Sequence, residues 1–145
     1  MQAKKRSNIL NTRVMIEKVS PEIDGGKFPV KRAVGEKVVV RANVFTDGHE
    51  AVAAFMLYRE IGASKWKSVR MKHAGNDAWV GTFTIGKESD YEYTLRAGLD
   101  HFGSWLNDIK KKADAGQDIK IELLIGLEIL EKAYKRMDAK ARKIV

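Results

Sequence analysis

Residues 37–45, KVVVRANVF, decide the fold that we expect for this chain. Apolar residues occupy every second position, so the pattern places on one face of a β-strand the side chains of Val38, Val40, Ala42 and Val44. The run stops at the glycine-containing sequence Thr46-Asp47-Gly48-His49, which is typical of a turn. The stretch therefore predicts a strand with one buried face.

Four stretches after this strand extend the same pattern. Residues 51–58, AVAAFMLY, are short and lie between a turn and the break at Gly62, which favours a strand over a helix. Residues 65–71, 79–85 and 91–97 alternate again. Six or seven short strands with turns about ten residues apart are typical of a β-sandwich of the immunoglobulin type. We expect a mainly β protein with an immunoglobulin-like sandwich.

The segment before this strand, SPEIDGGKFPVKRAVGE at 20–36, holds both prolines of the chain and a glycine pair. A glycine-rich segment beside a lysine can bind phosphate, but Gly25-Gly26-Lys27 lacks the glycine spacing of a P-loop and the helix that should follow it. Proline fixes φ and holds the preceding residue extended, while glycine permits a reversal with positive φ. We interpret the segment as a shaped loop between strands.

The character of the sequence changes near Asp100, where we expect helices. Apolar residues spaced by three and four form one stripe of a helix, with a second row at Ile125, Ile129 and Ala133. Such a stripe must lie against a partner. We predict a dimer or interdomain interface at Leu123, Leu127, Leu130, Tyr134 and Met137, and the stripe continues to Ala141. The last residues carry no helix stop signal, so we expect a piece of a longer polypeptide.

Length and composition restrict the class of protein. A chain of 145 residues with 44% hydrophobic content can form one domain and a small extension. We expect no transmembrane span and no export signal, because no apolar run approaches eighteen residues and the N-terminus lacks a signal-peptide core. The sequence has no cysteine, which fits the reducing cytoplasm, where we place the protein.

The net charge of +8 raises the possibility of a nucleic-acid partner. Half of this excess lies in residues 1–13, at Lys4, Lys5, Arg6 and Arg13. The only run of three lysines, at 110–112, has aspartates on either side. The sequence shows no spacing of a helix-turn-helix, a zinc finger or an RNA-recognition strand. Nucleic-acid binding therefore stays an alternative supported by charge alone.

The sequence shows no catalytic, metal or cofactor site. His49, His73 and His101 lack the spacing of a helical metal pair, and there is no cysteine to join them. Asp100 and His101 are adjacent, so we interpret them as a polar pair at a hinge rather than an acid–base pair. Among the aromatic residues, Trp66 lies between two lysines and is the candidate surface contact for a glucan; core packing explains the others better.

Four segments, in order, carry a resemblance to a known family. They are RVMIEKVSPEIDGGKFPVKRAVGEKVVVRANVFTDGHE at 13–50, GNDAWVGTF at 75–83, YEYTLRAGLDHFGSW at 91–105 and KKADAGQDIKIELLIG at 111–126. Together they resemble the N-terminal region of the bacterial α-1,4-glucan:maltose-1-phosphate maltosyltransferases, which belong to the α-amylase superfamily. The sequence departs from the family at Gly98-Leu99, where a bulkier pair is expected.

The resemblance implies a parent enzyme that transfers maltosyl units from maltose 1-phosphate to an α-1,4-glucan in the cytoplasm. In the family the catalytic carboxylates belong to a (β/α)₈ barrel, which needs about 200 residues and does not fit behind a sandwich here. The resemblance thus implies no catalytic residue in this chain, and as partners the barrel of the same polypeptide and a second subunit of a homodimer. Membrane binding is not expected.

These inferences define the domains and functions that we expect. Residues 1–12 form a disordered basic tail, residues 13–99 an immunoglobulin-like sandwich, and residues 100–145 the start of a helical insertion. The leading function is that of a non-catalytic structural and dimerisation domain of a maltosyltransferase. The alternatives are an α-glucan-binding module anchored by Trp66 and a basic nucleic-acid-binding domain.

Overall fold

The computed structural model describes residues 13–137 of the chain. The chain divides into two compact units, Met1–Leu99 and Asp100–Val145, which are considered one at a time. The tail that we predict at 1–12 and the last residue of the apolar stripe, Ala141, lie outside the described residues.

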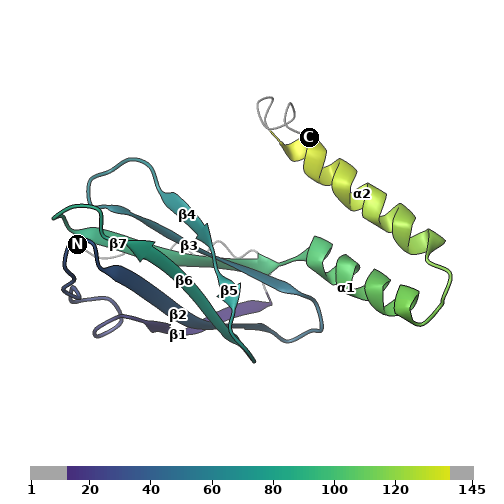
Figure 1. Ribbon diagram of the computed structural model, residues 1–145, viewed down its shortest axis with the longest axis horizontal. Coiled ribbons are helices and arrows are strands. Elements are labelled where there is room, and N and C mark those ends of the chain that lie inside the picture. The colour runs from purple at the N-terminus through teal and green to yellow at the C-terminus, as the bar shows by residue number, and fades with distance from the viewer. Residues whose placement is uncertain (1–12, 138–145) are drawn as a thin grey trace. The chain divides into compact units, whose positions relative to one another are not determined.

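The first unit is a sandwich of two antiparallel sheets (Figure 1). The four-stranded sheet has the order β1-β2-β6-β5, formed by Val14–Ser20, Lys37–Thr46, Ala78–Thr84 and Lys72–His73. The three-stranded sheet has the order β4-β3-β7, formed by Lys67–Arg70, Val52–Glu60 and Tyr91–Leu99. The prediction of a mainly β sandwich followed by helices is confirmed.

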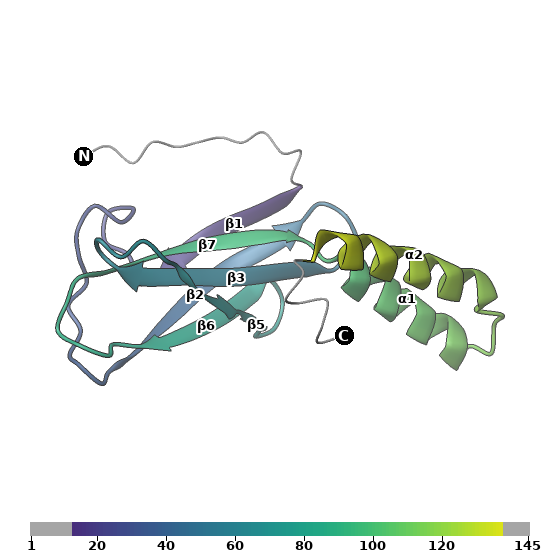
Figure 2. The same cartoon turned by 90° about the horizontal axis from the view of Figure 1, so that it is seen from above.

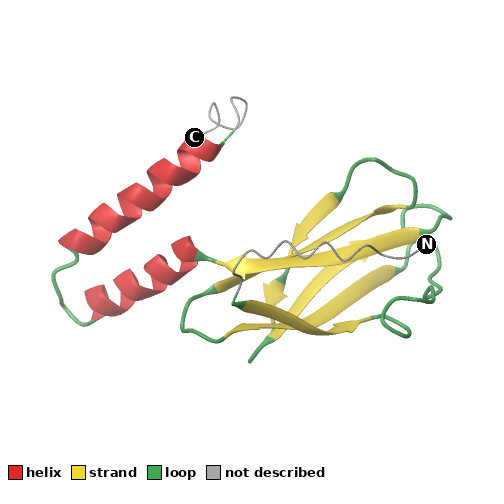
Figure 3. Cartoon of the chain, turned by 180° about the vertical axis from the view of Figure 1, so that it is seen from behind, coloured by secondary structure: helices red, strands yellow, loops and turns green. Residues whose placement is uncertain are grey.

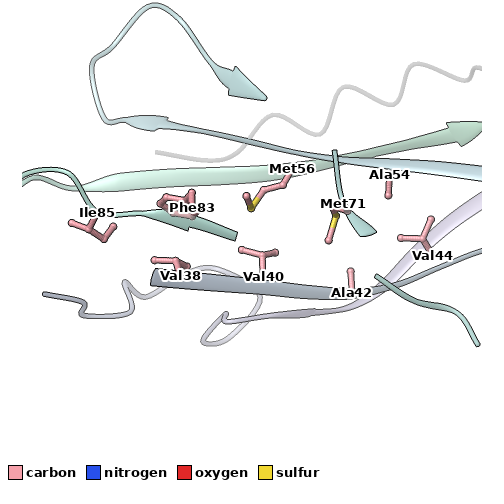
Figure 4. Close-up of a cluster of buried hydrophobic side chains, with 9 residues drawn as sticks. All are labelled: Val38, Val40, Ala42, Val44, Ala54, Met56, Met71, Phe83 and Ile85. Atoms are coloured by element: carbon pink, nitrogen blue, oxygen red, sulfur yellow. The ribbon is translucent and has the colours of Figure 1, made fainter. Parts of the chain in front are cut away.

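The core lies between the two sheets, and β2 supplies its centre. Val38, Val40, Ala42 and Val44 are all buried, as the alternation in 37–45 predicts. Figure 4 shows them with the other buried side chains of the cluster, which are Ala54, Met56, Met71, Phe83 and Ile85. Gly81 in β6 faces the same space, and a Cβ there would lie 3.2 Å from the Cγ of Met71. Glycine at this position leaves room for the side chains of Met71 and Met56, which a larger residue would have to displace by a few tenths of an ångström.

Residues 21–36 connect β1 to β2 as a loop, which confirms the interpretation of this segment. Asp24, Gly25 and Gly26 have positive φ, and the chain reverses so that Ile23 and Phe28 form an isolated bridge. The N–H of Gly26 donates to the carbonyl of Ile23 at 3.1 Å. The loop therefore closes on itself through backbone hydrogen bonds.

The second unit contains two helices, α1 at His101–Asp114 and α2 at Lys120–Arg136, which run side by side (Figures 2 and 3). Asp100 caps α1, because its carboxylate accepts a hydrogen bond from the N–H of Gly103 at 2.8 Å. Gly116, with φ of 68°, lies in the turn after α1. Helix α2 ends at Arg136, and Met137 follows in an extended conformation. Met137 is therefore not part of the helical stripe.

Candidate functional site

The two helices are joined by a contact that the sequence pattern does not reveal. The indole N–H of Trp105 in α1 donates to the backbone carbonyl of Glu122 in α2 at 2.6 Å. The carboxylate of the same Glu122 accepts a hydrogen bond from Lys112, and its side chain is only 14% exposed. Gly126, one turn further along α2, is buried against the ring of Trp105. These residues hold the helices together as a hairpin.

Two ion pairs involve glutamates of α2, and they differ in the elements that they join. The hydrogen bond from Lys112 lowers the pKa of Glu122 below its usual value of 4.5, and this pair joins the two helices. The hydrogen bond from Lys132 lowers the pKa of Glu128 in the same way, but both residues belong to α2, one turn apart. Of these two pairs, the first therefore links the contact between the helices to pH, whereas the second links only the stability of α2 itself.

One face of α2 carries a row of exposed apolar side chains, which we call the apolar stripe. Its members are Leu123, Leu127, Leu130 and Tyr134, with exposed fractions of 49%, 57%, 52% and 47%. Glu122 and Gly126, which contact α1, lie on a neighbouring side of the helix. The hairpin contact thus leaves the stripe uncovered.

A groove of about 890 Å³ runs along the hairpin. Trp105, Ile125, Ile129 and Ala133 form its apolar part, and cationic side chains such as Lys111 and Arg136 line it as well. Ile125, Ile129 and Ala133 are the second row of the sequence pattern, which we expected to broaden the stripe. The second row lines the groove and the first row does not, although Ile125 of the second row is 46% exposed, about as much as Tyr134 of the stripe.

Trp66 lies in the sandwich unit, between β3 and β4, and 37% of it is exposed. The guanidinium of Arg59 stacks over its ring at 4.3 Å from the ring centroid. Glu92 and the carbonyl of Ala63 hold that guanidinium, at 2.6 Å and 2.9 Å respectively. The indole therefore has one covered face and is fixed in orientation. Trp66 and the apolar stripe belong to different units.

His73 makes packing contacts within the sandwich unit. His73 packs edge-on against Trp79, with 5.3 Å between ring centroids, and one of its ring nitrogens contacts the carbonyl of Asn76.

Within residues 13–137 no group of three or more ligand side chains could hold a metal ion. In the same part of the chain, no helix is both long and apolar enough to span a bilayer. Lys4, Lys5 and Arg6 lie outside the described residues, so nucleic-acid binding stays a prediction.

The described residues thus form a mainly β domain, a sandwich followed by a helical hairpin, in which α2 keeps the apolar stripe exposed. The chain belongs to the family described as alpha-1,4-glucan:maltose-1-phosphate maltosyltransferase, domain N/S, whose model matches residues 12–145.

Curated relatives carry the name alpha-1,4-glucan:maltose-1-phosphate maltosyltransferase. The protein of Chlorobaculum tepidum is 47% identical over 119 residues, which are 82% of this chain and 18% of that protein. Those of Methylacidiphilum infernorum and Myxococcus xanthus are each 42% identical, over 84% and 85% of this chain and over 18% and 19% of their own length. The chain thus spans about a fifth of the length of these relatives.

Proposed function

We propose that this chain is the non-catalytic N-terminal structural and dimerisation domain of a cytoplasmic enzyme that transfers maltose from maltose 1-phosphate to α-1,4-glucans. The names of the relatives support the reaction, and the small share of their length that the chain matches supports a role as one domain among several. A catalytic barrel needs about 200 residues, more than the helical unit contains. The active site then belongs to another part of the parent polypeptide.

The strand order supports the immunoglobulin-like assignment within this proposal. If β1 is strand A, then β2, β5 and β6 take the places of strands B, D and E of that fold, and the spatial order β1-β2-β6-β5 is the order A-B-E-D of the first immunoglobulin sheet. Strands β3 and β7 take the places of C and F in the opposite sheet. We therefore classify the sandwich as immunoglobulin-like.

The apolar stripe carries the dimerisation proposal. Its residues are spaced by four, three and four, a pattern that reads the same in both directions along α2. If two copies of α2 packed antiparallel about a twofold axis, Leu127 would meet Leu130 of the partner, and Leu123 would meet Tyr134. A face that matches itself in this way fits a second copy of the same chain.

The strength of such a dimer follows from its size. The four side chains are about half exposed already, so burying each one gains about 1 kcal/mol, less than the 1.5–3 kcal/mol for a fully exposed residue. Association costs at least about 4 kcal/mol. Eight such side chains gain about 8 kcal/mol, which exceeds the lower bound of this cost by about 4 kcal/mol. We expect a weak dimer of the isolated chain, reinforced in the parent enzyme by further contacts.

Sedimentation of the chain over a range of concentrations tests the proposal. The unchanged chain should dimerise at high micromolar concentration, and Leu127→Asp with Leu130→Asp should make it monomeric. The matched control is Ile121→Asp with Leu124→Asp, which adds the same charges to α2 at exposed positions outside the stripe. Circular dichroism should show that both variants keep their helices. A monomeric wild-type chain, or equal loss of dimer in both variants, would contradict the proposal.

Trp66 supports a second candidate function, the binding of an α-glucan. The fixed, partly exposed indole offers a flat apolar surface of the kind on which a sugar ring can stack. Affinity electrophoresis in gels containing glycogen tests this function. The chain should be retarded in such gels, and Trp66→Ala should abolish the retardation. The control Ile61→Ala, which removes a more exposed apolar side chain from the same region, should leave it unchanged. Binding through stacking should also persist at high salt, unlike phosphate contacts.

A further inference from the structure

The sandwich described in residues 13–137 has four edge strands, and three of them are protected. β4 has four residues and β5 has two, so neither offers a long backbone edge. β1 is longer, but its register shifts between Glu17 and Ser20, Lys18 has a φ of 50°, and Pro21 follows. Short strands, bulges and proline are the devices that prevent an edge from pairing with another strand.

The fourth edge, β7, has none of these devices. It has nine residues, no proline and an unbroken register with β3 from Tyr91 to Leu99. The pattern of hydrogen bonds shows which backbone groups face away from β3. Ile61 donates to the carbonyl of Asp90 at 2.8 Å, whereas on the other side of β3 Met71 donates to the carbonyl of Ala54. Ile61 and Asp90 are directly opposite each other in this register and form a hydrogen-bonded pair. In an antiparallel ladder every second pair of opposite residues is hydrogen-bonded, so the even-numbered residues of β7, like Asp90, bond to β3.

The odd-numbered residues of β7 therefore direct their N–H and C=O groups away from the sheet. These residues are Tyr91, Tyr93, Leu95, Ala97 and Leu99. Within residues 13–137, no other strand forms backbone hydrogen bonds with these groups. The open edge is thus a regular row of donors and acceptors, the arrangement to which an extended segment adds as a new strand.

The layers of the sandwich indicate where such a strand would lie. The four-stranded sheet faces the three-stranded sheet, and β7 packs opposite β1. A strand beside β7 would extend the smaller sheet to equal the larger one. Its inner side chains would be apolar, because Val14 and Ile16 of β1 are only partly buried against the core. Its outer side chains would be polar, beside the exposed Thr94 and Arg96 of β7.

We propose that β7 pairs with an extended segment of alternating apolar and polar residues, supplied by the parent polypeptide from outside these 145 residues. This inference rests on the proposed role of the chain as one domain of a larger enzyme. A segment of the same polypeptide is present at an effective concentration up to the millimolar range, whereas a separate chain pays the full cost of association. A covalently linked strand is therefore favoured over the β7 of a second copy.

Amide hydrogen exchange, measured residue by residue on the 145-residue chain and on the parent enzyme, tests this inference. The amides of Tyr93, Leu95 and Ala97 should exchange about a hundredfold more slowly in the parent enzyme than in the chain alone. Those of Thr94 and Arg96, which bond to β3, should exchange slowly in both and serve as internal controls.

Three results would overturn the inference. The first is rapid exchange of the odd-numbered amides in the parent enzyme. The second is protection in the isolated chain that rises with concentration, which would identify a second copy as the partner. The third is protection in the isolated chain that disappears when residues 1–12 are removed, which would identify its own N-terminal segment.

A pair of variants at Ala97 provides an independent measurement. Ala97→Pro removes an N–H that faces away from β3, and Ala97→Val adds a comparable volume but keeps that N–H. The two variants should melt at the same temperature in the isolated chain, and the proline variant should melt several degrees lower in the parent enzyme. Equal melting in the parent would count against the added strand.

The stripe variant with Leu127→Asp and Leu130→Asp should leave the exchange of β7 unchanged, so the two proposals can fail separately.

Discussion

The indole ring of Trp105 lies so close to the backbone of Gly126 that a methyl group at position 126 would overlap ring carbon Cζ2. The same indole donates its N–H to the carbonyl of Glu122 one turn earlier in α2. Glycine inside a helix costs about 1 kcal/mol relative to alanine. At this position the cost is offset by the close approach of α1, which an alanine would prevent.

Gly126→Ala should therefore destabilise the helical unit, although alanine is the better helix former. We expect a loss of about 1–3 kcal/mol, because the ring cannot move away without losing its hydrogen bond to Glu122. Hydrogen exchange of α2 measures the change, with the sandwich strands as an internal reference. In a Trp105→Leu background the loss should shrink, since the smaller side chain leaves room. A more stable α2 in the single variant would show that the contact does not constrain position 126.

The hairpin should loosen in acid because of the pair formed by Lys112 and Glu122. The pKa of Glu122 is lowered in the folded chain, so the pair contributes stability above pH 4.5 and loses it as the pH falls through the lower folded value. Glu122→Gln should remove this pH dependence of the contact between α1 and α2, which the fluorescence of Trp105 reports between pH 3 and pH 6 when Trp66 and Trp79 are replaced by phenylalanine. Glu128→Gln is the matched control, because its pair lies within α2 alone. The same response in both variants would contradict this assignment.

Trp79 should contribute to the sandwich through its ring rather than its N–H. The ring packs against the buried core, while its indole nitrogen is buried with no hydrogen-bond partner among residues 13–137. Trp79→Ala should cost about 3–5 kcal/mol in a denaturant titration. Trp79→Phe should cost less than half as much, because it keeps an aromatic ring and removes a donor that lacks a partner. Equal costs would mean that the N–H contributes to stability after all.

Alkaline pH should weaken the sandwich through Tyr93. Its phenolic O–H donates to the carbonyl of Pro21 at 2.8 Å, and burial together with nearby Glu22 raises its pKa above the usual 10.0. The neutral form is favoured in the folded state, so stability is complete below pH 10 and falls as the pH rises through the higher folded value. Tyr93→Phe should be less stable at neutral pH by about 1 kcal/mol and should lose less stability above pH 10. Parallel pH profiles of the two proteins would exclude this role.

Strict alternation made the sandwich predictable. In 37–45 the period of two places the same four side chains inward in the sequence and in the structure, because one register buries Val38, Val40, Ala42 and Val44 together, whereas the opposite face holds only Val39 and Phe45 as apolar residues. The loop at 20–36 was equally readable, because proline and glycine limit the backbone directly. At Gly98 a Cβ would meet no atom within 4 Å, so the departure from the family pattern leaves space rather than strain.

The helical site was predictable only in part. Helical spacing found the apolar stripe, but periodicity does not say which of two adjacent rows faces a neighbouring helix. Gly126 was the signal that could have decided it, because an isolated glycine in a helical pattern often marks close packing. The end of α2 was missed because no glycine, asparagine or proline marks it, and Met137 therefore looked helical. Trp66 could be placed at the surface from its lysine neighbours, whereas its stacking on Arg59 depends on the path of the turn between β3 and β4, which the alternation does not specify.

The contact of Trp105 with α2 also gives the molecule a spectroscopic label. The chain has three tryptophans, and Trp105 is the one that lies in 100–145. A protein in which Trp66 and Trp79 are replaced by phenylalanine would emit from the helical unit alone. Its emission maximum should shift to longer wavelength when the indole leaves Glu122 and Gly126 for water, while the amide NMR signals of the strands report the sandwich. Heating such a variant would show in one experiment whether the hairpin and the sandwich melt together or in succession.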